Sequence, residues 1–361
     1  MANTTNGTNA PAIACFSAAK VACYSLILVI SLVGNILVIL VVYKNKNMRK
    51  TINYFIVNMA ASDLLTPLVV MPLQIARTLM LLQWAVPGKF GEALCKIAFF
   101  LTELPGPVSD LSLICMAFDR FVGVVFPLRV GLISSRVRVS MIIFTWAIPV
   151  GFAATSLYGF RLGQKGQKHY CYWRWHDDPS IHTQVHRNYF TVASSVFFIA
   201  PLVLLILLYS VILITLGKRK FPRVNQSQEA KKRNRRVSRS ATVIALTIVL
   251  VFWICWCPYN TYMFLVAFQY NWKFPRECSK LLVFTISQTL TYANSAINPC
   301  IYFVLIENYR KGLRTVLPRT LSASFAGNSS LKVTRNVNRQ DTQVNDDGDC
   351  LELVEQPTVN S

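Results

Sequence analysis

The sequence predicts an all-α membrane protein in which seven helices cross a lipid bilayer and pack as a bundle. The chain has 361 residues, of which 53% are hydrophobic and only 15% are charged. Its apolar residues gather in seven stretches, and a hydrocarbon core about 30 Å thick needs about 20 helical residues to span it. Because backbone groups in lipid must be hydrogen-bonded internally, such stretches fold as helices. The spans are expected at residues 17–43, 53–82, 92–126, 136–158, 189–217, 237–268 and 279–305.

The distribution of basic residues predicts how this bundle, residues 17–305, is oriented. The formal net charge of +21 could by itself indicate a nucleic-acid partner or an anionic surface. If the N-terminus is outside, the short inner segments and adjoining helix ends carry 22 of the 37 lysine and arginine residues, the usual cytosolic bias. The basic run 231–239 adjoins a span, so we expect it to face membrane lipid, with no nucleic acid bound. The expected location is the plasma membrane, with the N-terminus extracellular.

Three segments outside the spans differ in character. Residues 1–16 form an extracellular N-terminus with glycosylation sequons at Asn3 and Asn6. The outer segment 159–188 contains the run HYCYWRW, whose alternation of aromatic and polar residues predicts a β-hairpin lid. Residues 318–361 are polar and lack apolar periodicity, so we expect a disordered cytoplasmic tail.

Polar residues within the spans are the first candidates for function, because each is costly in lipid unless it has a partner or a task. Asp63 is a lone carboxylate in the second span. It could hold a cation or a proton, or it could be a neutral acid that joins helices by hydrogen bonds. Glu103 and Asp110 in the third span are seven residues apart, which predicts that they share one helix face. Prolines within the spans predict hinges, at Pro72, Pro149, Pro201, Pro258 and Pro299.

Four cysteines face the oxidising outer side in this topology. Cys95 begins the third span and Cys171 lies in the long outer segment, so a bridge between them would fix that segment over the mouth of the bundle. Cys15 and Cys278 are the other outward pair. They could form a second bridge between the N-terminal arm and the seventh span, stay as free thiols, or leave Cys15 to pair with another chain.

The order of short motifs along the spans identifies a family resemblance. The motifs are GNILV with Asn35, NMAASDL with Asp63, Cys95, DRF at Asp119-Arg120-Phe121, Trp146, Pro201, CWCP with Trp256 and Pro258, and NPCIY from Asn298 to Tyr302. Over about residues 20–317 the chain resembles a rhodopsin-like (class A) G-protein-coupled receptor, which is not an enzyme. The segment ENYRKGLRTVL within 306–317 resembles the short amphipathic eighth helix of that family.

The resemblance implies partners and moving parts. It implies a heterotrimeric G protein, arrestin and receptor kinases on the cytosolic side, with Arg120 engaging the G protein when the sixth helix swings outward. The implied coupling and switch residues are Asp119, Arg120, Leu128, Trp256, Pro258, Asn298, Pro299 and Tyr302. No organic cofactor is implied, but an allosteric sodium ion is. The implied sodium residues are Asn35, Asp63, Ser109, Trp256, Asn294, Ser295 and Asn298.

The chain also departs from the family pattern. The usual DRY triplet is DRF, and Ser238 stands where an acid is expected near the base of the sixth helix, so Arg120 is expected to rely on Asp119 alone. Pro105, Gly106 and Pro107 in the third span are expected to deform that helix beside the ligand cavity.

The ligand class is suggested by two positions. Thr102 stands where amine receptors carry an aspartate, and Tyr292 stands where opsins carry the retinal lysine. The chain is most similar to neuropeptide receptors of the RFamide and neuropeptide Y-like groups, which implies an extracellular peptide ligand. The alternatives are a receptor for a non-peptide small molecule, and a membrane transporter or channel. Glu103 could pair with a basic ligand group or hydrogen-bond a neighbouring helix. The expected ligand-binding residues are Thr102, Glu103, Gly106, Tyr259, Asn260, Met263, Gln288 and Tyr292.

Overall fold

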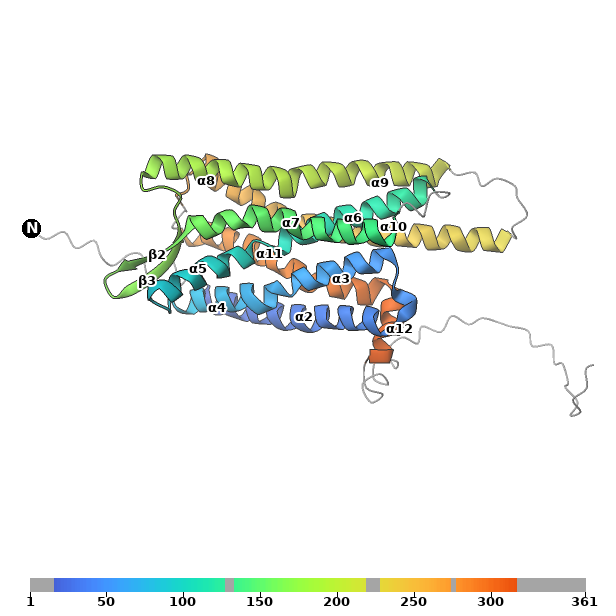
Figure 1. The fold of residues 1–361 in the computed structure, drawn as a ribbon, viewed down its shortest axis with the longest axis horizontal. Helices are drawn as coiled ribbons and strands as arrows, with labels where there is room; N and C mark the ends of the chain where they lie inside the picture. Colours follow the sequence, from blue (N-terminus) through green and yellow to red (C-terminus); the bar gives the residue numbers. More distant parts are fainter. Residues whose placement is uncertain (1–15, 127–132, 219–227, 274–276, 317–361) are drawn as a thin grey trace, which may run out of the picture. The chain divides into compact units, whose positions relative to one another are not determined.

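The computed structural model describes residues 16–126, 133–218, 228–273 and 277–316, with only the backbone described at 218 and 228–245. Long helices run side by side in one bundle (Figure 1), and α6 contacts α3, α7, α9 and α10. The helices are α2 (Ser17–Lys44), α3 (Thr51–Asp63), α4 (Met71–Leu79), α5 (Gly88–Thr102), α6 (Pro105–Val125), α7 (Ser135–Gly159), α8 (Pro179–Ser194), α9 (Ala200–Lys218), α10 (Gln228–Phe268), α11 (Cys278–Leu305) and α12 (Glu307–Val316).

Seven rods formed by α2 to α11 correspond to the seven predicted spans. Three of them are pairs of helices joined end to end: α3 with α4, α5 with α6, and α8 with α9. The α5–α6 rod is interrupted, and α11 carries several polar residues. Neither therefore contains an uninterrupted stretch apolar enough to be recognised as a membrane span from its composition alone. Within the described residues, the segments that are recognised in this way are Ser17–Lys44, Thr51–Leu79, Ser135–Gly159, Pro179–Gly217 and Leu246–Phe268.

The interruption in the third rod confirms the deformation expected from its Pro-Gly-Pro sequence. Helix α5 ends at Thr102, and α6 begins at Pro105 after two linking residues. Proline is tolerated in the first turn of a helix because the N–H groups there have no intrahelical acceptor. Two other rods carry a π-helical turn, at 66–70 just before Pro72 and at 195–199 just before Pro201. Proline and π-helical turns are both common causes of helix kinks.

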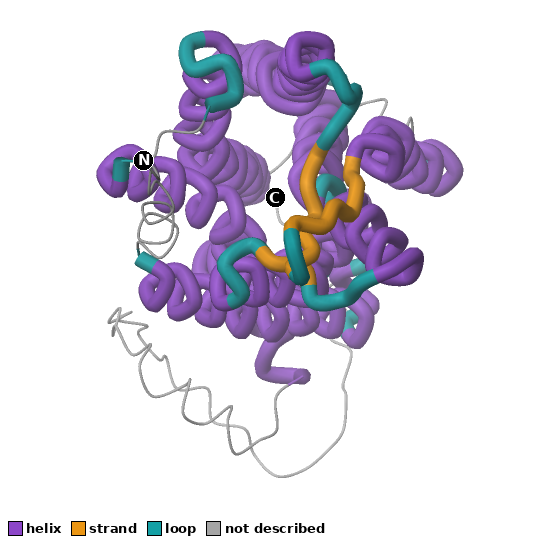
Figure 2. The backbone as a smooth tube through the Cα atoms, turned by 90° about the vertical axis from the view of Figure 1, so that its left-hand side faces the viewer, coloured by secondary structure: helices purple, strands orange, loops and turns teal. Residues whose placement is uncertain are grey.

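The predicted outer hairpin is confirmed, and the structure adds a third strand. Strands β2 (Phe160–Lys165) and β3 (Lys168–Trp173) pair antiparallel, with Leu162 opposite Cys171. The short strand β1 (Gln83–Trp84) pairs with the other edge of β3. Figure 2 shows these strands lying across the ends of the helices. The sheet therefore covers one end of the bundle.

The fifth rod begins ten residues before residue 189, where the fifth span was expected to begin. Helix α8 begins at Pro179, and the Asp178 carboxylate caps it by accepting hydrogen bonds from the backbone N–H groups of Ser180 and Ile181. The Ser180 hydroxyl, which donates to the same carboxylate oxygen at 2.6 Å, and these two backbone N–H groups hold the pKa of the Asp178 carboxyl below its ordinary value. An N-cap aspartate followed by proline is a common helix start. The segment is too polar to read as part of a span, so hydropathy alone missed it.

The inner half of the bundle has a continuous apolar core, which includes Phe55, Met59, Leu113, Tyr302 and Tyr309, all nearly or fully buried. Helix α12 packs against α2. A Cβ atom at Gly312 would lie 2.6 Å from Val41, so only glycine permits this close approach. Tyr309 is buried against the core, whereas Arg310 and Lys311 are exposed. Helix α12 thus has one packed and one charged face.

Candidate functional site

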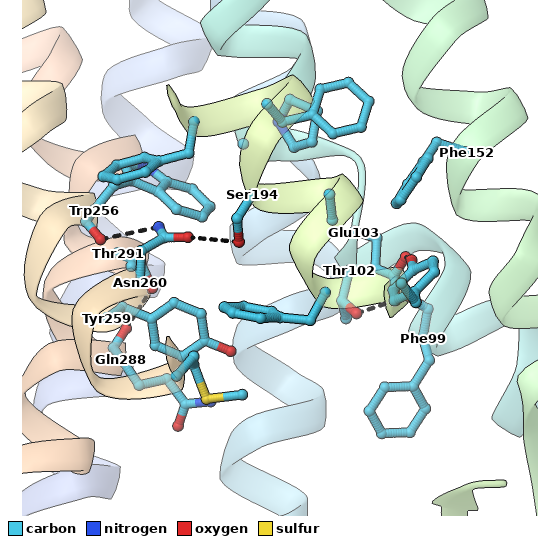
Figure 3. A pocket seen from close by; sticks show the side chains of 18 of the residues that line it. Phe99, Thr102, Glu103, Phe152, Ser194, Trp256, Tyr259, Asn260, Gln288 and Thr291 are labelled. Carbon is cyan, nitrogen blue, oxygen red and sulfur yellow. Dashed lines mark hydrogen bonds between the residues drawn. The ribbon is translucent and has the colours of Figure 1, made fainter. Parts of the chain in front are cut away.

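A cavity of about 400 Å³ lies among the helices beneath the sheet. Its walls are strongly aromatic, with lining residues from α4, α5, α6, α7, α8, α10, α11 and both hairpin strands. Figure 3 shows part of this lining from close by. Cavities of this size hold drug-sized ligands or the end of a peptide. The structure brings all the expected ligand residues to this one cavity: Thr102, Glu103, Gly106, Tyr259, Asn260, Met263, Gln288 and Tyr292.

The polar groups of the cavity are partly tied to one another. Asn260 donates to the backbone carbonyl of Trp256 at 3.1 Å and accepts from the Ser194 hydroxyl at 3.3 Å, as Figure 3 shows. Gln74 donates to the Tyr292 hydroxyl at 2.9 Å. These bonds hold the side chains in place while leaving apolar rings as most of the wall.

The inner end of the cavity is formed where Trp256 meets α6. A Cβ atom at Gly106 would lie 2.4 Å from Cη2 of the Trp256 indole, so the ring lies directly against the α6 backbone. The indole also stacks on Phe252, with ring centroids 5.7 Å apart. Glycine at 106 is therefore a packing requirement, because no other residue lacks the Cβ atom.

Two charged side chains line the cavity. One oxygen of Glu103 accepts a hydrogen bond from the Tyr189 hydroxyl at 2.7 Å. The Arg77 guanidinium lies over the Phe99 ring, 4.9 Å from its centroid. Sequence reasoning missed Arg77, which is not among the expected ligand-binding residues. Its place near the end of an apolar span is the signal that could have found it, because charges in spans usually face the interior or a water-filled cavity.

The sheet is fixed over the cavity at two places. A disulfide joins Cys95 of α5 to Cys171 of β3, which confirms the expected bridge. Beyond β3, Trp175 donates from its backbone N–H to Nδ1 of His182 at 3.2 Å and from its indole to Nδ1 of His186 at 3.1 Å. The two histidines lie one turn apart on α8, so the segment that follows β3 is held to that helix.

Cys278 is disulfide-bonded, which excludes the alternative of two free thiols and agrees with the possible second bridge. Cys15 lies outside the described residues, as do Asn3, Asn6 and Leu128, so its pairing stays a prediction. Non-reducing peptide mapping is expected to recover a Cys15–Cys278 linked peptide, because such a bridge would restrict the N-terminal arm at the cavity rim. Recovery of Cys15 as a free thiol, or linked to another chain, would contradict the pairing.

A second polar cluster surrounds Asp63 in the middle of the bundle. Asp63 is 2% exposed, and its carboxylate accepts hydrogen bonds from Ser109 at 3.1 Å and Asn298 at 2.9 Å. Asn35 donates to the backbone carbonyls of Ser31 and Ser295, at 2.8 and 3.0 Å.

Two buried amide oxygens, Oδ1 of Asn35 and Oδ1 of Asn294, have no hydrogen-bond partner among the described residues. Oxygen atoms of this kind suit a hard cation. Of the expected sodium residues, Ser109 and Asn298 contact Asp63 directly, whereas Trp256 lines the ligand cavity.

The residues expected to act as switches are placed as follows. Arg120 forms its ion pair with the neighbouring Asp119 at 2.9 Å. The side chain of Ser238 is not among those described. Tyr302 is fully buried, with its hydroxyl 3.9 Å from the Met59 sulfur. Within the described side chains, Asp119 is thus the one acidic partner of Arg120.

Glu103 and Asp110 of the third rod lie in different surroundings. Glu103 lines the cavity, whereas Asp110 is fully buried and does not line it. That the two share one helix face stays a prediction. Both carboxylate oxygens of Asp110 lack a hydrogen-bond partner among the described residues.

Comparison with known proteins identifies the family. The family described as 7 transmembrane receptor (rhodopsin family) matches residues 34–302, and the chain belongs to it. It is therefore a G-protein-coupled receptor, a multi-pass membrane protein and not an enzyme. Nothing in these matches supports a transporter or channel.

The relatives span more than one ligand class. A QRFP-like peptide receptor of Branchiostoma floridae is 30% identical over 302 residues, covering 81% of this chain and 76% of the relative. The neuromedin U receptor homolog nmur-2 of Caenorhabditis elegans is 26% identical over 324 residues, covering 81% and 78%. A histamine H2 receptor of Rattus norvegicus is 29% identical over 316 residues, covering 86% and 82%.

Proposed function

We propose that this receptor binds an extracellular peptide in the cavity beneath the hairpin and transmits the binding to heterotrimeric G proteins. The observation that carries the proposal is the cavity itself, which is large, aromatic and covered by the three-stranded sheet. Peptide receptors among the relatives support the same ligand class. The N-terminus lies outside in this proposal, and α12 lies along the inner membrane face with its charged side towards the lipid head groups.

A small-amine ligand is the second candidate, favoured by the histamine receptor among the relatives. Thr102 stands at the position where amine receptors carry an aspartate, and a threonine offers no charge to an amine. Its hydroxyl already donates to the Phe99 carbonyl at 2.7 Å. Glu103 is the acid that an amine could reach instead. A peptide can contact more of the residues that line the cavity than a small amine can.

One assay separates these candidates. The purified receptor is incubated with a G protein, and nucleotide exchange is measured with a random peptide library and with a panel of biogenic amines. Exchange driven by peptides supports the proposal. Exchange driven only by amines would replace it with the second candidate. Arrestin recruitment and phosphorylation by receptor kinases, also proposed, are then measured with the same activating compound.

Glu103 gives the proposed function a residue-level test. Glu103→Gln is expected to weaken the affinity of an activating peptide that carries a basic group at least tenfold, about 1.4 kcal/mol, because the ion pair is lost. The measurement is competition binding on membranes. Glu92→Gln is the matched control, because Glu92 pairs with Lys96 on the same helix and does not line the cavity. Unchanged affinity in Glu103→Gln would mean that Glu103 only bonds its neighbour Tyr189.

A further inference from the structure

We infer that the cavity recognises two opposite charges on one ligand, an anionic group at Arg77 and a cationic group at Glu103. This rests on the proposed peptide function and specifies it. In a peptide the anionic group is a free C-terminal carboxylate or an Asp or Glu side chain. The cationic group is a Lys or Arg side chain or the N-terminal amine.

Arg77 has no counter-charge of its own. It lies in the last turn of α4 and is partly buried, with its guanidinium over the Phe99 ring. Within the described residues it makes no ion pair and no hydrogen bond. A guanidinium has five N–H donors in a fork that fits a carboxylate in two-point contact. A partly desolvated cation without an acceptor is costly, and a ligand carboxylate offsets that cost.

Glu103 is the corresponding anionic group, with accepting capacity left over. It caps the end of α5, and only one of its oxygens is bonded, by the Tyr189 hydroxyl. Its other oxygen has no protein partner within the described residues, and its side chain lines the cavity. A carboxylate has room for about four hydrogen bonds, so most of its accepting capacity faces the cavity.

The two charges do not satisfy each other. No ion pair joins them in the described structure, although they are the only Lys, Arg, Asp or Glu side chains among the described residues of the cavity wall. Phe99, whose ring lies against the Arg77 guanidinium, is four residues before Glu103, which follows the last residue of α5. Four residues of α-helix rise about 6 Å, or about one turn. A ligand that carries its acidic and basic groups at two separate points fits this arrangement.

The rest of the wall strengthens this recognition. Phe99 stacks on Phe160 of the hairpin at 4.0 Å, and Trp173 lies 5.0 Å from the ring of Tyr189, the residue that bonds Glu103. Each charge is thus framed by rings that exclude water. Ion pairs formed in such surroundings are stronger and more selective than pairs at an open surface.

The experiment is a double-mutant cycle that uses the most potent activating peptide from the library screen as its probe. The peptide is synthesised in three forms: unchanged, with its acidic group converted to an amide, and with its basic residue replaced by citrulline or norleucine. Potency in the exchange assay is measured on wild type, Arg77→Gln and Glu103→Gln. Arg77→Lys keeps the positive charge and shows whether a change at this position disturbs folding. Lys96→Gln and Glu92→Gln are controls for loss of charge in general, because these two residues pair with each other and do not line the cavity.

The expected result is specific coupling between each peptide group and one residue. Amidation of the peptide lowers its potency at least tenfold on wild type but less than threefold on Arg77→Gln. Replacement of its basic residue lowers its potency at least tenfold on wild type but less than threefold on Glu103→Gln. Potent peptides that lack either charge, or equal losses for all peptide forms on Arg77→Gln, would overturn the inference while leaving the peptide function intact. A library without any activating peptide would instead remove the peptide function.

Discussion

In Asp63→Asn, sodium is expected to lose its effect on agonist affinity. We propose that a sodium ion binds at Asp63, held with Ser109 and Asn298, whose side chains already meet its carboxylate. The carboxylate is buried, so an ion of opposite charge stabilises its ionised form. The family resemblance implies that this region contracts on activation, and an ion that binds only the expanded state favours inactivity through differential affinity.

The measurement is agonist competition binding on membranes as sodium replaces N-methyl-D-glucamine at constant ionic strength. In wild type, sodium is expected to lower agonist affinity by about 5- to 150-fold, the usual range of allosteric coupling. Asp63→Asn is expected to show no difference between the two cations and to signal poorly while reaching the cell surface. Asp110→Asn is the matched control, since it neutralises another buried acid that has no hydrogen bond to this cluster. Wild-type binding that ignores sodium would make Asp63 a structural acid that joins helices.

Gly106→Ala is expected to lower the melting temperature of the detergent-solubilised receptor and to weaken binding of an activating peptide. The added Cβ would lie 2.4 Å from the Trp256 ring, which must then leave the α6 backbone. Overpacking of this kind costs about 1–3 kcal/mol. The displaced indole also enters the cavity that Gly106 and Trp256 both line.

Gly123→Ala provides the control within the same helix. Nothing lies within 4 Å of a Cβ placed at Gly123, so its substitution adds no contact. Alanine in a helix is favoured over glycine by about 0.5–1 kcal/mol, so this variant is expected to melt at the same temperature or slightly higher. Equal melting temperatures for Gly106→Ala and Gly123→Ala would show that Trp256 has room to move at little cost.

Most of the architecture follows from local pattern. Apolar length placed the seven rods, the HYCYWRW run placed the hairpin, and the Pro105-Gly106-Pro107 sequence placed the break in the third rod. The motif order brought the expected ligand residues to one cavity. Each of these signals lies within a few adjacent residues or in the spacing of motifs along the chain.

What escaped prediction depends on partners distant in the chain. The Arg77–Phe99 contact and the 86-residue separation of Tyr189 from Glu103 arise only when different rods pack. Strand β1 has two residues and exists only because β3 offers it an edge.

The attachment of the hairpin bears on how fast a ligand leaves. The cover is joined to α5 through Cys171 and to α8 through the bonds of Trp175, so it is held on two sides. A cover of this kind cannot swing away about one hinge, and a bound peptide must withdraw along its own length past the hairpin edge. Residence times should therefore be long. Differences in affinity among related peptides are expected to lie in their dissociation rates rather than in their rates of association.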